Sequence, residues 1–163
     1  MDEMDFLKEK LINVARAKGI CAEGHRQMLA SAGVGDMVDY YVANPDWCLE
    51  RSFPDMRTLR EHFADMGGKG VFVDRIFHGE RLDELQAYVF HNCRGTVKVG
   101  LNVERGSAPM LYLANGCRLH VVGDGPIAKE PTQIPIYVFG RNDLSARDNR
   151  RVRFRVFKHD VIV

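Results

Sequence analysis

The first third of the chain places apolar residues at helical spacing. In "DFLKEKLINVARAKG", Leu7, Leu11 and Val14 recur three or four positions apart, which is the period of one helix face. Asp2 or Asp5 can cap the start of this segment, because a short acidic side chain accepts hydrogen bonds from free backbone N–H groups. The pattern therefore predicts an amphipathic helix at the N-terminus.

Further helix signals continue to residue 66. Residues 22–31 form a second periodic segment, and Asp36 is placed to cap a third. Pro45 and Pro54 each stand at a predicted first helical position, where the missing N–H of proline costs nothing. We expect five short helices in a helical region that spans residues 1–66.

At "DMGGKGVFVD" the hydrophobic period changes from that of helices to that of strands. Glycines form a joint there, and beyond it β-branched and aromatic residues gather in short clusters, as is typical of strands. The clusters cover residues 71–73, 87–90, 96–99, 110–114, 118–122, 134–139 and 152–157. Residues 67–163 are therefore predicted to form a β-rich region, which makes the protein α+β.

Within this region a pattern repeats. Tyr88, Tyr112 and Tyr137 follow one another at 24 and 25 residues, and each begins an apolar pair. "YVFHNCRGTVKV" and "YLANGCRLHVVG" also share a Cys-Arg step 24 residues apart. Such intervals match the coil length of a parallel β-solenoid, whose coils stack about 4.8 Å apart. We expect about three coils, with the helical region covering the first coil and the last strand closing the other end.

The repeat resembles short right-handed β-helix proteins, which implies a stacked, mostly structural scaffold. "VFHNC" and "YLANGC" also resemble small bacterial proteins associated with phage-type genes. The alternative fold is an antiparallel β-sandwich with Greek-key connections. A sandwich needs hairpin turns between its strands, and "ANGC" holds the single Asn-Gly dipeptide of the chain.

The repeated Asn and Cys residues have two interpretations. In stacked coils Cys93 would lie over Cys117, and Asn92 near Asn115, as an internal ladder that fills a corner. The alternative is a redox or metal pair. We favour the structural ladder, because no His or carboxylate recurs beside both cysteines at a ligand-like spacing.

Other candidate chemistry is sparse. Cys21 and His25 stand four residues apart on a predicted helix and could share a metal with Cys48 or His62. His78 and Glu80, with Asp74 nearby, resemble acid–base equipment but also fit a polar turn. We expect no metal, no cofactor and no catalytic residue, since no phosphate loop, dinucleotide fingerprint or nucleophile elbow occurs.

The most distinctive charge pattern lies near the C-terminus. Strand alternation in "RRVRFRVFK" places Arg151, Arg153 and Arg155 on one face, and Arg150 and Lys158 flank them. These five residues could bind a polyanion or an acidic protein surface. The competing interpretation is an edge strand that carries charge to prevent pairing with another chain.

Composition narrows the partner classes without naming one. The chain has 23 basic and 22 acidic residues, so net charge favours neither nucleic acid nor an anionic membrane. The N-terminus lacks the features of a secretory signal, no apolar stretch approaches membrane-spanning length, and the four cysteines are scattered. We expect a cytoplasmic, non-enzymatic structural or protein-interaction module that self-associates or binds a protein, with nucleic-acid binding as the alternative.

Overall fold

The N-terminal part of the protein is helical, as the apolar spacing predicts. The structure, a computed structural model, describes residues 2–162. The helices are α1 (Glu3–Ala17), α2 (Ala22–Leu29), α3 (Val34–Ala43), α4 (Pro45–Glu50) and α5 (Met56–Thr58). A π-helical turn, η1 (Leu59–Phe63), and a 3₁₀ turn, η2 (Gly67–Lys69), then lead to the first strand.

Helix α1 begins with a capping box. Asp2 Oδ1 accepts a hydrogen bond from the Asp5 N–H at 2.8 Å, and the Asp5 carboxylate accepts from the Asp2 N–H, so two otherwise free donors are satisfied. Val14 was expected on the buried face but is exposed. The buried positions near it are Ile12 and Ala15, because the core-facing stripe is rotated by about one residue.

Two expected helix starts were wrong. Helix α3 has Gly33 as its N-cap, and Asp36 lies within the first turn, where its carboxylate accepts from the Ala32 N–H at 2.8 Å. Pro54 precedes Asp55, which is the true N-cap of α5 and accepts from the Thr58 N–H. Pro45 does occupy the first turn of α4 as predicted.

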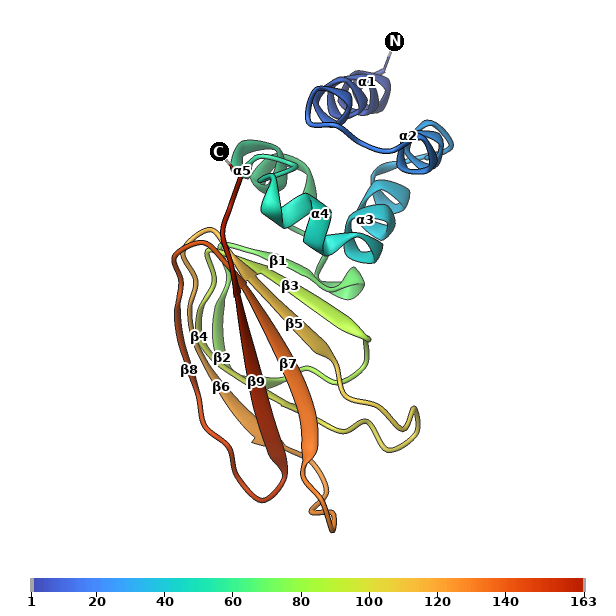
Figure 1. Ribbon diagram of the computed structural model, residues 1–163. Coiled ribbons are helices and arrows are strands. Elements are labelled where there is room, and N and C mark those ends of the chain that lie inside the picture. Colours follow the sequence, from blue (N-terminus) through green and yellow to red (C-terminus); the bar gives the residue numbers. More distant parts are fainter. Residues whose placement is uncertain (1, 163) are drawn as a thin grey trace.

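The C-terminal part is a parallel β-solenoid. Its strands are β1 (Val71–Val73), β2 (Ile76–Arg81), β3 (Ala87–His91), β4 (Arg94–Gly100), β5 (Met110–Ala114), β6 (Arg118–Asp124), β7 (Thr132–Phe139), β8 (Asp143–Ala146) and β9 (Val152–His159). Odd-numbered strands form one sheet, ordered β1-β3-β5-β7-β9, and even-numbered strands form the other, ordered β2-β4-β6-β8 (Figure 1). We call these sheet A and sheet B.

The solenoid prediction is confirmed and the sandwich alternative is wrong. Every pair of neighbouring strands is parallel, whereas a Greek-key sandwich is antiparallel. The strand pairs β3/β4, β5/β6 and β7/β8 are the three coils that the sequence repeat marks. The pair β1/β2 precedes them, and β9 follows.

The three repeated tyrosines do not stack as one column. Tyr112 pairs with Tyr137 in register, but its partner on β3 is Val89, and Tyr88 pairs with Leu111. Because side chains alternate along a strand, this one-residue offset turns Tyr88 to the opposite face of sheet A. Tyr88 consequently packs inside the solenoid, whereas Tyr112 faces the helices.

Sheet A is buried on both faces over much of its area. Its inward side chains meet those of sheet B in the solenoid interior, and its outward side chains pack against the helices. Figure 1 shows α3 and α4 lying across the strands of sheet A. The helical region therefore packs on the outer face of sheet A, β1 and β3 included, and does not close the end of the solenoid as a cap on the first coil would. This double burial explains why the strands of sheet A are nearly continuous apolar runs.

The apolar interior of the solenoid is covered differently at its two ends. At the β1/β2 end the guanidinium of Arg75 lies 5.1 Å from the ring centre of Phe72 and 4.9 Å from that of Phe77, so it covers the end of the interior by cation–π contact. At the other end β9 is the last strand of sheet A in the described part of the chain, and Val156 is 44% exposed. The C-terminal end is therefore the open one.

A buried polar contact joins the helices to the solenoid. His91, at the end of β3, is fully buried and its Nε2 contacts the hydroxyl of Tyr41 on α3. The Asn115 side-chain amide lies 2.8 Å from His91 Nδ1. Since that amide nitrogen can only donate, Nδ1 accepts and Nε2 carries the proton that it donates to Tyr41. Burial lowers the pKa of His91 to about 3, so the ring is neutral at physiological pH.

Candidate interaction surface at the C-terminal end of the solenoid

Strand β9 separates arginines from apolar residues by simple alternation. Phe154 and Val156 pair in register with Ile134 and Ile136, which are fully buried, so they point toward the solenoid interior. Arg153 and Arg155 point to the outer face of sheet A and are exposed. Within residues 2–162, neither arginine takes part in an ion pair.

The other three basic residues of the C-terminal cluster do not join this face. Arg150 and Arg151 precede β9, and Arg151 Nη1 lies 3.6 Å from Asp124 Oδ1. Lys158 pairs in register with the buried Val138, so its side chain starts from the inward side of the strand. The basic surface on β9 therefore consists of two residues, Arg153 and Arg155.

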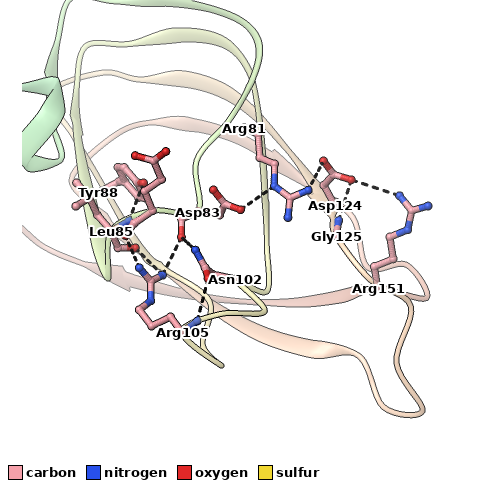
Figure 2. A network of polar contacts seen from close by, with 10 residues as sticks. Arg81, Asp83, Leu85, Tyr88, Asn102, Arg105, Asp124, Gly125 and Arg151 are labelled. Atoms are coloured by element: carbon pink, nitrogen blue, oxygen red, sulfur yellow. Dashed lines mark hydrogen bonds and ion pairs between the residues drawn. The ribbon is translucent and has the colours of Figure 1, made fainter.

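Arg151 belongs to a polar network that ties loops together. Asp124 lies between Arg81 and Arg151, and Arg81 also pairs with Asp83 at 3.0 Å (Figure 2). In the same view the Arg105 guanidinium donates to the backbone carbonyls of Asp83, Glu84 and Leu85. The N–H groups of these arginines are already bonded to acceptors within the protein. The arginines therefore hold the connections between coils in place.

Beside the two arginines runs a ladder of aromatic rings. The rings of Tyr112, Tyr137 and Phe157 stack on consecutive strands, with centres 4.9 and 5.2 Å apart. Burial, the Asp46 carboxylate and Tyr137 raise the pKa of Tyr112 to about 12. The ladder becomes more exposed toward β9, where Phe157 is 41% exposed.

A groove opens at the inner end of this ladder. It has a volume of about 510 Å³, with Met110, Tyr112 and Ala87 on its floor and residues of α3 and α4 as its wall. The wall includes Val42, Ala43 and Pro45, and the Asp39–Lys69 ion pair stands at its rim. We call the uncovered face between the groove and β9 the C-terminal surface; it comprises Met110, Pro135, Tyr137, Arg153, Arg155 and Phe157.

The outer backbone edge of β9 is partly blocked. The side chains of Asp148 and Asn149 accept hydrogen bonds from the Phe154 and Val152 N–H groups, both at 2.9 Å. Lys158 adds an inward-pointing charge farther along the same edge. Capped donors and inward charges are devices that prevent another strand from pairing with an edge. The side chains on the outer face of β9 are therefore better placed for binding than its backbone edge.

The Asn and Cys residues of the repeat lie at the corners between sheet A and sheet B. Asn92 and Asn115 each follow a strand of sheet A and adopt left-handed φ values of 50° and 60°. Cys93 and Cys117 are buried, and the Cys93 N–H lies 3.4 Å from Cys117 Sγ. In the next coil Asn142 takes the corner position, and its Oδ1 accepts from the Cys117 N–H at 2.7 Å.

Thiol reactivity should follow this burial. We expect one thiol of the four, that of Cys21, to react rapidly with a chromogenic disulfide reagent in the native protein, because Cys21 alone is exposed. Burial raises the pKa of Cys48 to about 12, which removes its reactive thiolate. Unfolding in denaturant should expose all four thiols, and rapid native reaction of more than one would contradict the burial of the corner cysteines.

Three of the residues considered for metal binding or acid–base chemistry, Cys21, Glu80 and Asp74, form structural hydrogen bonds. Cys21 caps α2 by accepting from the Gly24 N–H, and within residues 2–162 no three His, Cys, Asp or Glu side chains converge as metal ligands, Cys48, His25 and His62 included. Glu80 accepts from the backbone N–H of His78. Asp74 binds Arg60, and this hydrogen bond lowers the pKa of the Asp74 carboxyl.

Charge is unevenly divided between the two parts of the chain. Residues 1–66 contain 12 acidic and 8 basic residues, whereas residues 67–163 contain 10 acidic and 15 basic residues. The balanced total therefore conceals an acidic helical part and a basic solenoid. A basic solenoid attracts acidic partners over distances set by the ionic strength.

Comparison with known proteins adds no family to this description. No protein-family model, curated protein or solved structure matches the chain. The resemblance to phage-associated bacterial proteins therefore remains a prediction. Among residues 2–162, no helix has the length and apolar character needed to cross a bilayer.

Proposed function

We propose that the protein is a non-enzymatic interaction module that binds an acidic protein partner through the C-terminal surface. One observation carries the proposal: Arg153 and Arg155, two outward arginines without ion pairs within residues 2–162, adjoin Phe157, the exposed end of the aromatic ladder on sheet A. Arginine, tyrosine, phenylalanine and methionine, which this surface presents, are enriched in protein interfaces.

Nucleic-acid or other polyanion binding through the same strand is the second candidate. The excess of basic residues in the solenoid supports it. Against it, Arg151 is paired with Asp124 and Lys158 points inward, so only two cations face outward along β9. Nonspecific nucleic-acid binding draws on many phosphate contacts. The exposed apolar area of Phe157 is better matched by a protein surface.

Self-association through β9 is the least favoured arrangement. Two copies paired edge to edge would bring the arginines of both outer faces together, which is unfavourable. The capped amides of Val152 and Phe154 also leave less of the edge for a second strand. We therefore propose a different, acidic protein as the partner, and not a second copy of this chain.

Site-specific photo-cross-linking tests the proposal. A photoreactive phenylalanine analogue at position 157 should yield a discrete cross-linked protein in cells of the source organism, whereas the analogue at Ile127, an exposed loop residue, should not. The purified partner should then lose about tenfold or more in affinity with Arg155→Glu, since a rim charge is replaced by a repulsive one. A nuclease-sensitive product at position 157 would favour the polyanion candidate. A partner bound equally by the variant would contradict the proposal.

A further inference from the structure

We infer that the partner presents an extended segment, with an apolar side chain in the groove and an acidic side chain at Arg155, about three residues apart. This inference rests on the proposed function and specifies how the C-terminal surface is used. It follows from the groove, the aromatic ladder and the distribution of charge around them.

The groove is suited to a protruding side chain. Its volume of about 510 Å³ lies in the range of small-molecule and side-chain pockets, and α3 and α4 form a wall on one side. A flat folded surface would meet that wall before it reached Met110 and Tyr112 on the floor. An extended segment can lie along the sheet and insert one side chain beside the wall.

The ladder sets the distance between the two contacts. Tyr112 and Phe157 are two strand spacings apart, with ring-to-ring steps of 4.9 and 5.2 Å. Arg155 lies two residues before Phe157 on the same outward face of β9. An extended chain advances about 3.3 Å per residue, so about three residues connect the groove to Arg155. Arg155 pairs in register with Pro135, so the segment would cross β7 at Pro135, beside Tyr137.

The charges around the groove and on β9 indicate which end of the bound segment is acidic. The groove end carries Asp46, which lies close enough to Tyr112 to influence its pKa, together with Asp39. Asp39 is paired with Lys69, whereas Arg153 and Arg155 at the other end have no ion pair with any residue from 2 to 162. A carboxylate in the segment is therefore repelled at the groove and attracted at β9.

Selection from a displayed library of random peptides tests this inference on the intact protein. Peptides enriched on the wild type should carry an acidic and an apolar residue about three positions apart. On Arg155→Glu the acidic residue should be replaced by Lys or Arg in the enriched peptides. Met110→Gln, similar in volume but more polar, should weaken the binding of synthetic versions of the wild-type peptides about fivefold or more, because the glutamine amide loses its hydration when the apolar side chain covers it.

Arg94→Glu provides the matched control. Arg94 is an exposed strand arginine on the outer face of sheet B, so this variant changes net charge equally without touching the C-terminal surface. It should enrich the wild-type peptides. If the same peptides are enriched on Arg155→Glu, or if Met110→Gln binds them as tightly as the wild type, the inference is wrong. If no peptide is enriched while the cross-linked partner still depends on Arg155, the extended segment is wrong and the proposed function stands.

Discussion

Replacing Gly95 with alanine should destabilise the protein by about 3 kcal/mol or more. Gly95 lies in β4, in register with Phe77 on β2 and Leu119 on β6, and has a left-handed φ of 103°. A Cβ atom built there would lie 2.0 Å from the Phe77 carbonyl oxygen. The backbone of β2 or β4 would have to move, and the Phe77 ring carried by β2 packs against the rings of Phe72 and Phe90.

Two other glycines separate the causes of this loss. At Gly100 a Cβ would lie 1.8 Å from the Asp124 carbonyl oxygen, but its φ is not left-handed, so Gly100→Ala tests the collision alone. Gly68→Ala is the control, because no atom lies within 4 Å of its added Cβ. Urea denaturation followed by circular dichroism gives the three free energies of unfolding. A Gly95→Ala variant within about 0.5 kcal/mol of Gly68→Ala would show that the coils adjust without cost.

The repeat predicted the solenoid because stacking imposes a coil length, but the repeat alone could not supply the register. From β4 to β6 the offset is 24 residues, as the Cys-Arg steps indicate, whereas from β3 to β5 it is 23. The difference is Gly116, an extra left-handed residue in the second corner. An insertion at a corner leaves the apolar pattern of each strand intact, so only the pairing reveals that Tyr88 and Tyr112 face opposite ways.

The C-terminal surface was predictable only in part. Alternation along β9 placed Arg153 and Arg155 opposite Val152, Phe154 and Val156, because a strand has a fixed period of two. The pairing of Arg151 with Asp124 depends on the end of strand β6, in an earlier coil. The groove depends on where α3 and α4 pack on sheet A, and no local sequence pattern predicts that position. The one sequence signal for this surface was the 25-residue spacing between Tyr112 and Tyr137, whose rings do stack.

His91 escaped sequence analysis because nothing local marks it as buried. It lies in "VFHNC", where only the repeated Asn and Cys were interpreted, and its partner Tyr41 is 50 residues away in the sequence. Strand alternation puts His91 on the outward face of β3, the side covered by the helices. Burial of a histidine there requires a polar partner from each side, and Tyr41 and Asn115 supply them.

Breaking this contact should loosen the attachment of the helices to the solenoid. Tyr41→Phe removes the hydroxyl and leaves the Nε2–H of His91 buried without an acceptor, which should cost about 1–3 kcal/mol. Tyr40→Phe is the matched control, since the Tyr40 ring is only half-buried and its hydroxyl takes no part in the His91 contact. Equal stability of the two variants in urea denaturation would mean that the Tyr41–His91 contact adds nothing.

The same histidine should make stability depend on pH. In the unfolded chain His91 has an ordinary pKa near 6.5, whereas in the folded protein burial lowers its pKa to about 3. Between these values the unfolded state binds one proton more, so the free energy of unfolding falls as pH falls, by about 1.4 kcal/mol per unit. Above about pH 6.5 His91 contributes no pH dependence, and its full effect is reached near pH 3.

Comparison of wild type with His91→Gln isolates this effect. From pH 7.5 to pH 5 the wild type should lose about 2 kcal/mol more than the variant, because glutamine does not titrate and every other histidine is common to both. Below about pH 5 the carboxyls of Asp55, Glu61 and Asp74, whose pKa values are lowered by their hydrogen bonds, add a slope of the same sign in both proteins. Parallel stability curves between pH 7.5 and pH 5 would show that His91 takes up a proton without opening the contact between helices and solenoid.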